Sequence, residues 1–405
     1  WAGRPFDLVL FGATGFTGAL VAQVLQATAA RPGEPPLRWA LAGRSLARLD
    51  AVRQRIAAGA DLPLIAADAG DATALAALVR RTRAVVTTVG PYQRHGEPLL
   101  AACAAAGTDY LDLCGEPAWM ARMIERHQAT AQASGARIVF SCDFDSIPFD
   151  LGVVYLQDLA RQRFGSPLAR VDGLVKVMKG AASGGTVASL LATLEAMAAD
   201  PAQARLMADP FSLTPGFRGP AQPESHAAEY DAQARSWTVP FIMAAINTKN
   251  VHRTHALRGH PWGRDFVYSE RQTTGDGPGG RARAHALAQA FRLQNLLLGF
   301  APSRALLRAW VLPRPGQGPG RADVAAEEAQ EVVDVADEQL AGARVDGGVD
   351  RLGEVDDDRA VGGHEHVELG QVAVHDPGAQ HADHRGEQDV EDPAGDLRRV
   401  LEVAE

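Results

Sequence analysis

The 405-residue sequence contains only three cysteines, three lysines and five tyrosines, and aromatic residues make up 6% of it. Cys103, Cys114 and Cys142 show no paired spacing, which argues against a disulfide framework or a zinc site and fits a reducing compartment. The sequence also lacks an uncharged apolar run of about 18 residues, which argues against a membrane-spanning helix, and it shows no secretory signal. We therefore expect a cytoplasmic protein. Because the sequence begins at Trp1 rather than Met, we also expect the native start to lie upstream.

Charge is distributed unevenly along the chain. The formal net charge is −9, but the segment from Arg321 to Glu405 alone holds 24 acidic residues and seven arginines, a net of −17. Residues 1–320 therefore carry about +8, which suits an anionic cofactor or substrate. No basic run is interleaved with aromatic residues, so the charge does not indicate nucleic-acid binding.

The segment 321–405 uses only ten residue types, all of which have codons that begin with G or C. The chain has 37 arginines and three lysines, which is typical of a GC-rich genome, and a wrong reading frame in such a gene would produce this alphabet. One hypothesis is therefore a frameshift artefact from about residue 321. The alternative is a low-complexity acidic tail that is natively disordered. Its five histidines do not favour a metal site in this composition.

The stretch from Phe6 to Gly18 places a short apolar run, Leu8–Phe11, directly before glycines at 12, 15 and 18. An amphipathic pattern follows to about Ala30, so the sequence predicts a buried strand, a tight turn and a helix. Such glycines permit the turn, the approach of a pyrophosphate and close helix packing, while N–H groups at the helix start face the phosphates. A glycine-rich turn that binds nothing is the alternative. The predicted dinucleotide-binding residues are Gly12, Ala13, Thr14, Gly15, Phe16, Thr17 and Gly18.

A second apolar strand, Trp39–Gly43, is followed directly by Arg44 and Ser45. NAD-binding folds usually place an acidic residue here to bond the ribose 2′-hydroxyl, whereas an arginine accommodates the 2′-phosphate of NADP. Arg44 and Ser45 therefore favour NADP (NADPH) as the cofactor. The alternative is a surface arginine at the start of the next helix, Leu46–Ala58.

Strands and helical patterns alternate over about 140 residues, which predicts an α/β fold with a Rossmann-type doubly wound parallel sheet in residues 1–150. The later strands are predicted at Leu62–Ala67, Ala84–Val89, Asp109–Leu113 and Arg137–Ser141. Because strand ends on one side of such a sheet line the ligand crevice, we expect Val89, Gly90 and Pro91 beside the nicotinamide. Tyr92 and His95 follow and are candidate catalytic residues, with packing or surface roles as the alternatives.

Asp145 and Ser146 follow the last of these strands, where another helix is predicted to begin. One interpretation is structural: either side chain caps the helix, with Pro148 in its first turn. The other is functional: both side chains lie at the crevice and contact nicotinamide or substrate. Asp145 and Ser146 therefore join the candidate catalytic residues.

Residues 151–320 are expected to form a second α+β domain that binds the substrate. Alternating polar and apolar residues over Val171–Lys179 predict an antiparallel-type strand, and Gly184-Gly185-Thr186 precedes a predicted helix to Ala199. Residues 200–235 are Pro-rich and polar and predict a long loop or lid.

The remainder of the second domain is predicted as a helix at Val239–Asn250, a strand at Asp265–Glu270 and one or two apolar helices over Ala282–Val311. The patch Leu296–Phe300 within the last segment favours core packing over peripheral membrane contact.

Seven stretches together resemble one family. They are Gly12-Ala-Thr-Gly-Phe-Thr-Gly18, Ala42-Gly-Arg-Ser45, Val89-Gly-Pro-Tyr92, Ala106–Glu116, Phe144-Asp-Ser-Ile-Pro148, Ala245-Ile-Asn-Thr248 and Pro261-Trp-Gly-Arg-Asp-Phe266. On these residues the sequence resembles the saccharopine dehydrogenase-like oxidoreductases, most closely the bacterial trans-acting enoyl reductases, over about residues 5–321. Family members continue past the stretch that is Leu312–Pro319 here into further strands and a helix, which are not recognisable in this sequence.

The resemblance implies an NADP-dependent reductase. Trans-acting enoyl reductases serve polyketide synthases that lack their own enoyl-reducing domain, so the resemblance implies an acyl-thioester substrate carried by a synthase and a role in lipid synthesis. The founding saccharopine enzymes instead act on a C–N bond of an amino acid, which leaves an amino-acid dehydrogenase as an alternative. A non-catalytic NADP-binding protein is a third. A short-chain dehydrogenase is rejected because no tyrosine has a lysine four residues after it.

Enoyl reduction moves a hydride from NADPH to the β-carbon of an enoyl thioester. The reaction then needs hydrogen-bond donors near the thioester oxygen and a proton at the α-carbon. Tyr92, His95 and Ser146 are the candidate donors, and Asp145 is expected to orient one of them.

Overall fold

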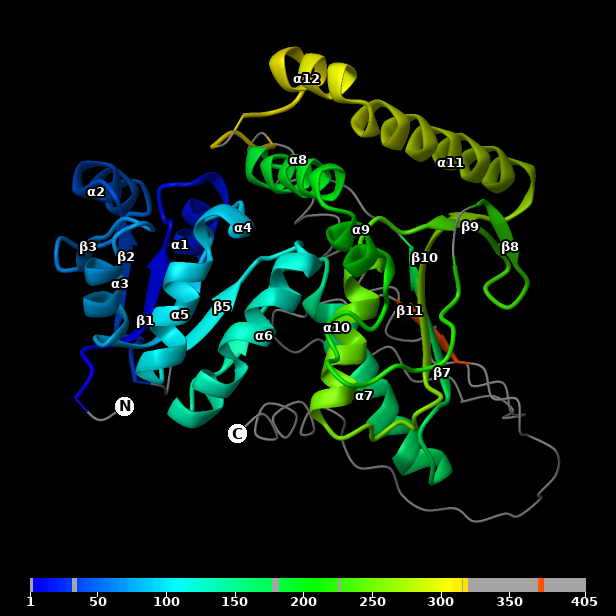
Figure 1. Ribbon diagram of the computed structural model, residues 1–405, viewed down its shortest axis with the longest axis horizontal. Helices are drawn as coiled ribbons and strands as arrows, with labels where there is room; N and C mark the ends of the chain where they lie inside the picture. The colour runs from blue at the N-terminus through cyan, green and yellow to red at the C-terminus, as the bar shows by residue number, and fades with distance from the viewer. Residues whose placement is uncertain are drawn as a thin grey trace, which may run out of the picture.

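The computed structural model describes residues 3–30, 35–176, 182–224, 227–314 and 316–319, together with the backbone of 371–374. Two sheets organise these residues, one built from the first 139 residues and one from later segments (Figure 1).

The first sheet consists of six parallel strands in the order β3-β2-β1-β4-β5-β6. These strands are β1 (Phe6–Phe11), β2 (Trp39–Gly43), β3 (Leu64–Ala66), β4 (Thr82–Thr87), β5 (Asp109–Asp112) and β6 (Ile138–Val139). The order reverses between β1 and β4, as the Rossmann prediction requires, and it places the ligand crevice outside the carboxyl ends of these two strands.

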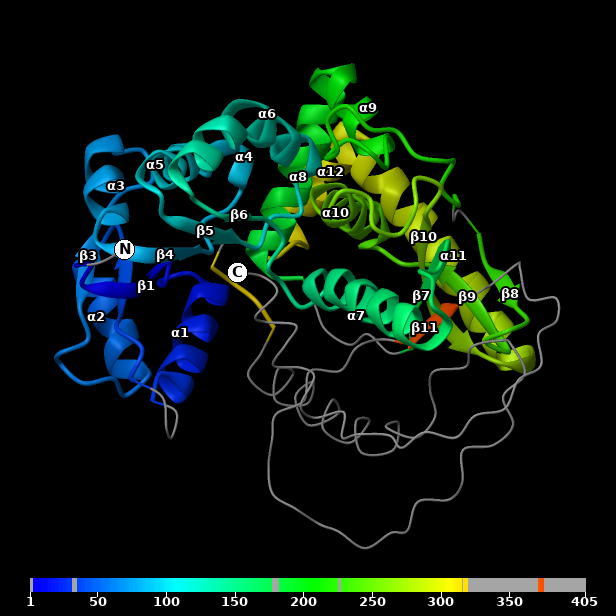
Figure 2. The same cartoon turned by 90° about the horizontal axis from the view of Figure 1, so that it is seen from below.

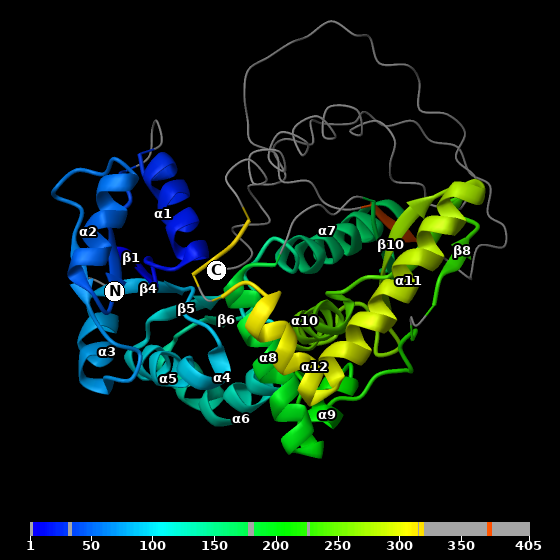
Figure 3. The same ribbon diagram turned by 90° about the horizontal axis from the view of Figure 1, so that it is seen from above.

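Helices cover both faces of this sheet (Figures 2 and 3). Leu10 packs toward α1 (Phe16–Thr28) and α2 (Leu46–Arg55), whereas its neighbours Val9 and Phe11 belong to the core on the other face. That second core is covered by α3 (Ala72–Val79), α5 (Glu97–Ala106) and α6 (Pro117–Ser134). Because both faces are buried, β1 is continuously apolar from Leu8 to Phe11, which is typical of a parallel strand.

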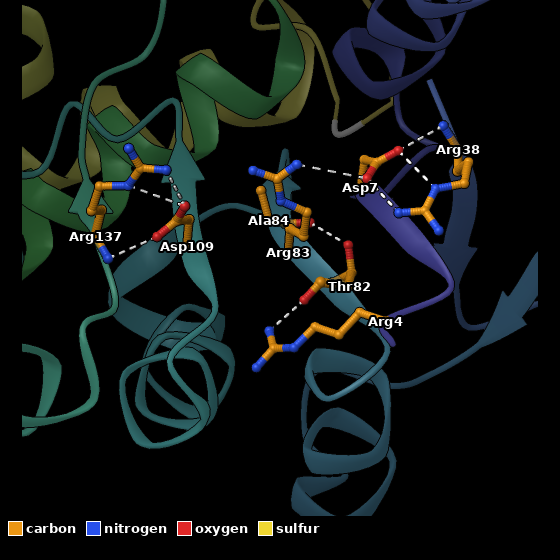
Figure 4. Close-up of polar contacts among 8 residues, drawn as sticks. All are labelled: Arg4, Asp7, Arg38, Thr82, Arg83, Ala84, Asp109 and Arg137. Carbon is orange, nitrogen blue, oxygen red and sulfur yellow. Dashed lines mark hydrogen bonds and ion pairs between the residues drawn. The ribbon is translucent and has the colours of Figure 1, made fainter. Parts of the chain in front are cut away.

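Ion pairs and hydrogen bonds connect neighbouring strands at the amino ends of the sheet (Figure 4). Arg38 donates to both carboxylate oxygens of Asp7, at 2.7 and 3.1 Å, and these hydrogen bonds hold the pKa of Asp7 below its ordinary value. The guanidinium of Arg137 donates twice to one carboxylate oxygen of Asp109, at 2.7 and 3.1 Å, and Arg4 donates to the carbonyl of Thr82 at 2.6 Å. The opposite, carboxyl edge carries the candidate site.

The second sheet is mixed, with the order β11-β7-β10-β9-β8. Its strands are β7 (Arg170–Val175), β8 (Glu229–Asp231), β9 (Ser236–Pro240), β10 (Val267–Gly275) and β11 (Gln371–Val374). Helices α7 (Ile147–Phe164) and α10 (Ala244–Leu257) share an apolar core with β7 and β10, whereas α11 (Gly277–Gly299) packs against β9 and β10. The remaining helices are α4 (Tyr92–His95), α8 (Gly184–Ala199), α9 (Pro201–Ala208) and α12 (Ala301–Trp310).

The second domain differs from the sequence prediction in several elements. The strand predicted as antiparallel, β7, pairs parallel with β10 and antiparallel with β11. The predicted loop 200–235 contains α9 and β8. The Asp200 carboxylate caps α9 by accepting a hydrogen bond from the Ala202 N–H, and β8 pairs with β9. The predicted helix at Val239 is wrong at its start, since β9 runs to Pro240 and α10 begins at Ala244.

The glycines Gly184 and Gly185 form the first turn of α8 rather than preceding it, and Ser183 is the capping residue. Strand β11 lies within the predicted acidic tail, and residues 321–370 and 375–405 of that segment lie outside the described residues.

Candidate active site

The predicted dinucleotide turn lies between β1 and α1, as the sequence indicates. Gly12 has a φ of 93°, and a Cβ on Gly18 would overlap the Gly12 carbonyl oxygen, so both positions require glycine. Gly15 occupies the N-cap of α1, and in the described part of the chain its position provides no side-chain cap for the first N–H groups of the helix. This geometry fits a pyrophosphate at the helix start.

Arg44 lies at the carboxyl end of β2, and its side chain is 77% exposed. Its Nε is 4.0 Å from the carboxylate of Asp68, which follows β3. Ser45, by contrast, uses its hydroxyl to accept a hydrogen bond from the Arg48 N–H and so caps α2. The arginine head is therefore accessible to a 2′-phosphate, whereas the hydroxyl of Ser45 already has a structural partner.

The loop after β4 is held by a buried glutamate that the sequence analysis did not single out. The Glu116 carboxylate accepts hydrogen bonds from the N–H groups of Tyr92 and Gln93, both at 2.9 Å. The preceding Gly90–Pro91 peptide bond is cis. Glu116 therefore fixes the segment that follows Val89 at the rim of the predicted crevice. The sequence could have indicated this residue, because Glu116 ends the stretch Ala106–Glu116 that resembles the family.

Tyr92 is buried, and its hydroxyl is engaged within the protein. It donates to the carbonyl of Thr87 at 3.0 Å and accepts from the Leu113 N–H at 3.1 Å. Burial raises the pKa of Tyr92 well above its ordinary value. His95, at the end of α4, is exposed, and in the described part of the chain no hydrogen bond joins it to Tyr92 or Ser146.

Ser146 occupies the N-cap position of α7, but its side chain does not cap the helix. Its hydroxyl instead donates a 2.8 Å hydrogen bond to Oδ1 of Asn247 on α10. The Asn247 Nδ2 group donates to the carbonyl of Asp145 at 2.8 Å and to the carboxylate of Glu270 at 3.0 Å. Glu270 also accepts from Tyr268. The capping interpretation of Ser146 is therefore wrong, and the side chain is held from the second domain.

Two carboxyl groups, Asp143 and Asp145, lie next to Ser146 just beyond β6. Burial, and then the charge of Asp145, raises the pKa of Asp143 to about 7, and burial also raises the pKa of Asp145. Within the described residues, Asp143 Oδ1 has no hydrogen-bond partner. The segment after β6 therefore holds one carboxyl group, Asp143, that can carry a proton near neutral pH, beside a second, Asp145, whose pKa is also raised.

The stretch Leu312–Pro319 reaches the dinucleotide turn from the end of α12. The Gly184 N–H donates to the carbonyl of Gln317 at 2.8 Å, which joins this stretch to α8. A Cβ on Gly318 would lie 2.5 Å from the ring of Phe16, so the backbone passes directly over the first residue of α1. Figure 3 shows this segment crossing from α12 toward α1.

Within the described ranges, no group of three or more His, Cys, Asp or Glu side chains is placed to hold a metal ion. The helices of the same ranges are all too short or too polar to cross a bilayer.

Comparison with known proteins identifies the family. The family model of the saccharopine dehydrogenase NADP-binding domain matches residues 8–139. A trans-acting enoyl reductase of Mycobacterium tuberculosis is 40% identical over 337 residues, which cover 79% of this chain and 78% of that protein. The trans-acting enoyl reductase of Mycobacterium ulcerans is 39% identical over 334 residues with the same coverage.

The chain belongs to the trans-acting enoyl reductase family of saccharopine dehydrogenase-like proteins. It is an NADP-dependent oxidoreductase with a Rossmann-type cofactor domain and a second, mixed-sheet unit. Among solved structures, the saccharopine dehydrogenase of Saccharomyces cerevisiae matches 47% of this chain and 40% of its own, at 16% identity and a TM-score of 0.30.

Proposed function

We propose that this protein reduces the carbon–carbon double bond of an enoyl thioester that a polyketide-type synthase carries. The observation that supports this proposal best is the identity of about 40% to trans-acting enoyl reductases over more than 330 residues. That match is longer than the cofactor domain of residues 8–139, so it includes the segments expected to contact the substrate.

The cofactor part of the proposal assigns the pyrophosphate to the turn Gly12–Gly18 and the 2′-phosphate to Arg44. Val89, Gly90 and Pro91 lie in the loop that follows β4 and would border the nicotinamide. NADPH bound in this position supplies the hydride that the β-carbon of the substrate accepts.

The catalytic part assigns proton transfer to the residues that follow β6. The buried Ser146 hydroxyl donates to Asn247, and the Ser146 backbone N–H donates to the Asp143 carbonyl, so we assign Ser146 to positioning the neighbouring carboxyl groups rather than to proton donation. Asp145, beside Asp143, is assigned to keep a proton available near the α-carbon, because burial raises the pKa of both carboxyls.

Tyr92 and His95 complete the proposed site in different ways. The Tyr92 hydroxyl bonds Thr87 and Leu113, so we assign this side chain to shaping the nicotinamide loop. His95 is exposed on the same short helix and remains the proposed alternative proton donor.

The test follows NADPH absorbance with the full chain and two substrate panels. One panel holds 2-enoyl thioesters of increasing chain length, each as the N-acetylcysteamine thioester and as the same acyl group on a carrier protein. The other holds 2-oxo acids with amines that form imines. We expect NADPH oxidation with the first panel and a higher kcat/KM for the carrier-bound form. Oxidation only with the second panel would instead assign the protein to C–N chemistry.

A further inference from the structure

Helix α11 is apolar on a face that no described residue covers. Leu293, Leu296, Leu297 and Phe300 recur at the spacing of one helix face, and Leu296 is 70% exposed. The buried residues in the first half of α11 are small, namely Gly280, Ala284 and Ala288. The expectation that the Leu296–Phe300 patch is core is therefore wrong except for Leu298, which is 7% exposed.

Helix α12 continues this exposed apolar surface. Leu306 and Trp310, one turn apart, are 63% and 83% exposed, and Val311 directly after the helix is exposed as well. Leu307 points the other way and packs with Leu298 against Val187 and Leu191 of α8. Figure 1 shows α11 and α12 together along the upper edge of the molecule, with α12 above α8, and Figure 3 shows both helices on the side nearest the viewer. We call the exposed apolar side chains of these two helices the α11–α12 surface.

Charge on this part of the chain has one sign. From Gly277 to Pro319 the sequence contains six arginines and no aspartate, glutamate or lysine. The side chains of Arg292 and Arg314 have no hydrogen-bond or ion-pair partner among the described residues. Arg308 lies 3.7 Å from Glu195 on α8. The apolar stripe is therefore flanked by cationic groups without compensating anions on the same helices.

We propose that the α11–α12 surface docks on a bilayer that contains anionic lipid. Leucine, phenylalanine and tryptophan on one helix face, with arginine beside them, are the composition of helices that lie in the membrane interface. The arginine stems follow the apolar surface while their guanidinium groups reach the lipid phosphates.

A second copy of the chain does not match this surface. The side chains of Arg292 and Arg314 have no partner among the described residues, and pairing two copies of the same patch by a twofold axis would add only further arginines, with no acid from either helix pair. An anionic lipid surface supplies the missing charge and accepts the exposed apolar side chains at the same time.

The α11–α12 surface also lies close to the candidate active site. Glu195 of α8 pairs with Arg308 on α12 and, at 3.1 Å, with Arg94 on α4. A Cβ on Gly90 would lie 3.3 Å from the hydroxyl of Ser189, also on α8. Docking would therefore place the bilayer on the outer side of α12, with α8 between α12 and the nicotinamide loop.

The experiment measures co-sedimentation of the full chain with vesicles of phosphatidylcholine alone or with one quarter phosphatidylglycerol. We expect binding to the anionic vesicles that weakens with added salt. The triple variant Leu296→Ser, Leu306→Ser, Trp310→Ser should lose at least about tenfold in binding. Leu257→Ser on α10, with a side chain 62% exposed, is the matched apolar control and should bind normally.

Charge is tested by Arg292→Gln with Arg314→Gln, which should weaken binding to the anionic vesicles, while Arg205→Gln on α9 should not. NADPH binding confirms that each variant is folded. A full chain that binds neither vesicle, or a triple variant that binds as well as the wild type, would overturn the proposal. If the wild type self-associates and the triple variant does not, the surface belongs to an interface with a second copy instead. If the protein binds an acidic protein but no vesicle, the surface belongs to that partner.

Discussion

The hydroxyl of Ser146 donates a 2.8 Å hydrogen bond to Oδ1 of Asn247, and this bond connects the start of α7 with α10. The other end of the Asn247 amide donates to the Asp145 carbonyl and to the Glu270 carboxylate. One buried amide therefore orients both residues that the sequence places at the carboxyl end of β6.

Replacing Asn247 should separate positioning from cofactor binding. Asn247→Ala leaves the Ser146 hydroxyl and one Glu270 oxygen without their partner, which should cost about 1–3 kcal/mol of stability. We expect kcat to fall while NADPH affinity stays within about twofold, because Asn247 does not contact the predicted cofactor turn. Urea unfolding, NADPH titration and steady-state kinetics measure the three quantities.

Asn250→Ala, three residues further along α10, is the control and should change stability by no more than about 0.5 kcal/mol. Equal losses of kcat in both variants would show that α10 acts only through general stability.

Glu270 should make the protein less stable as the pH rises. Burial raises the pKa of Glu270 to about 7 from an ordinary value of 4.5. The folded chain therefore keeps a proton that the unfolded chain releases, so this stabilisation is complete below about pH 4.5 and is lost by about pH 7. Glu270→Gln has no ionisable group at this position. Its free energy of unfolding should therefore lack roughly 3 kcal/mol of the decrease that the wild type shows as the pH rises through this range.

Urea unfolding at a series of pH values compares wild type, Glu270→Gln and the exposed control Glu125→Gln. Asp112 and Asp143 also have raised pKa values, so the difference between variants, rather than the wild-type slope, carries the information. Parallel pH curves for wild type and Glu270→Gln would contradict the prediction.

The glycine turn allows folding and cofactor binding to be tested separately. A Cβ on Gly15 would lie 3.4 Å from the Gly12 carbonyl oxygen, an ordinary contact, whereas a Cβ on Gly18 would overlap that atom. Gly15→Ala should therefore cost about 1 kcal/mol or less of stability but weaken NADPH binding about tenfold or more, because the methyl group occupies the space of the pyrophosphate.

Gly18→Ala should instead lower stability by roughly 1–3 kcal/mol through the close contact of α1 with the turn. Thermal unfolding and fluorescence titration with NADPH distinguish the two variants. If a folded Gly15→Ala protein binds NADPH with unchanged affinity, the assignment of the pyrophosphate to this turn is wrong.

Arg44 should determine the choice between NADPH and NADH. A guanidinium bonded to the 2′-phosphate contributes about 1.5–3 kcal/mol, so Arg44→Asp should lower the NADPH/NADH affinity ratio by about 10- to 100-fold. Arg55→Asp, at the other end of α2, makes the same charge change away from the site and is the control. If both variants shift the ratio equally, the effect is one of net charge and the role given to Arg44 is wrong.

The cofactor domain could be predicted from the sequence because its signals are local. Strand β2 was placed at its observed bounds, and the glycines at 12, 15 and 18 occupy the turn that their spacing indicates. The hydrogen bonds around Asn247 could not be predicted, because they join residues 23 to 102 positions apart.

The errors arose where tertiary packing decides the outcome. Leu296 is apolar and helical, as predicted, but the side of α11 that faces the sheet is filled by small residues. Ser146 occupies a capping position, yet a partner from α10 takes its hydroxyl. Periodicity indicates which residues share a face but not which face is buried.

The most direct test of the proposed function follows deuterium from NADPH labelled at C4 of the nicotinamide. The full chain is incubated with the labelled cofactor and an enoyl thioester, and the product is analysed by mass spectrometry and NMR. We predict a saturated thioester with one deuterium at the β-carbon and a solvent-derived proton at the α-carbon. Deuterium that appears only on the carbon of a newly formed C–N bond, in the parallel imine reaction, would contradict enoyl reduction as the function of this protein.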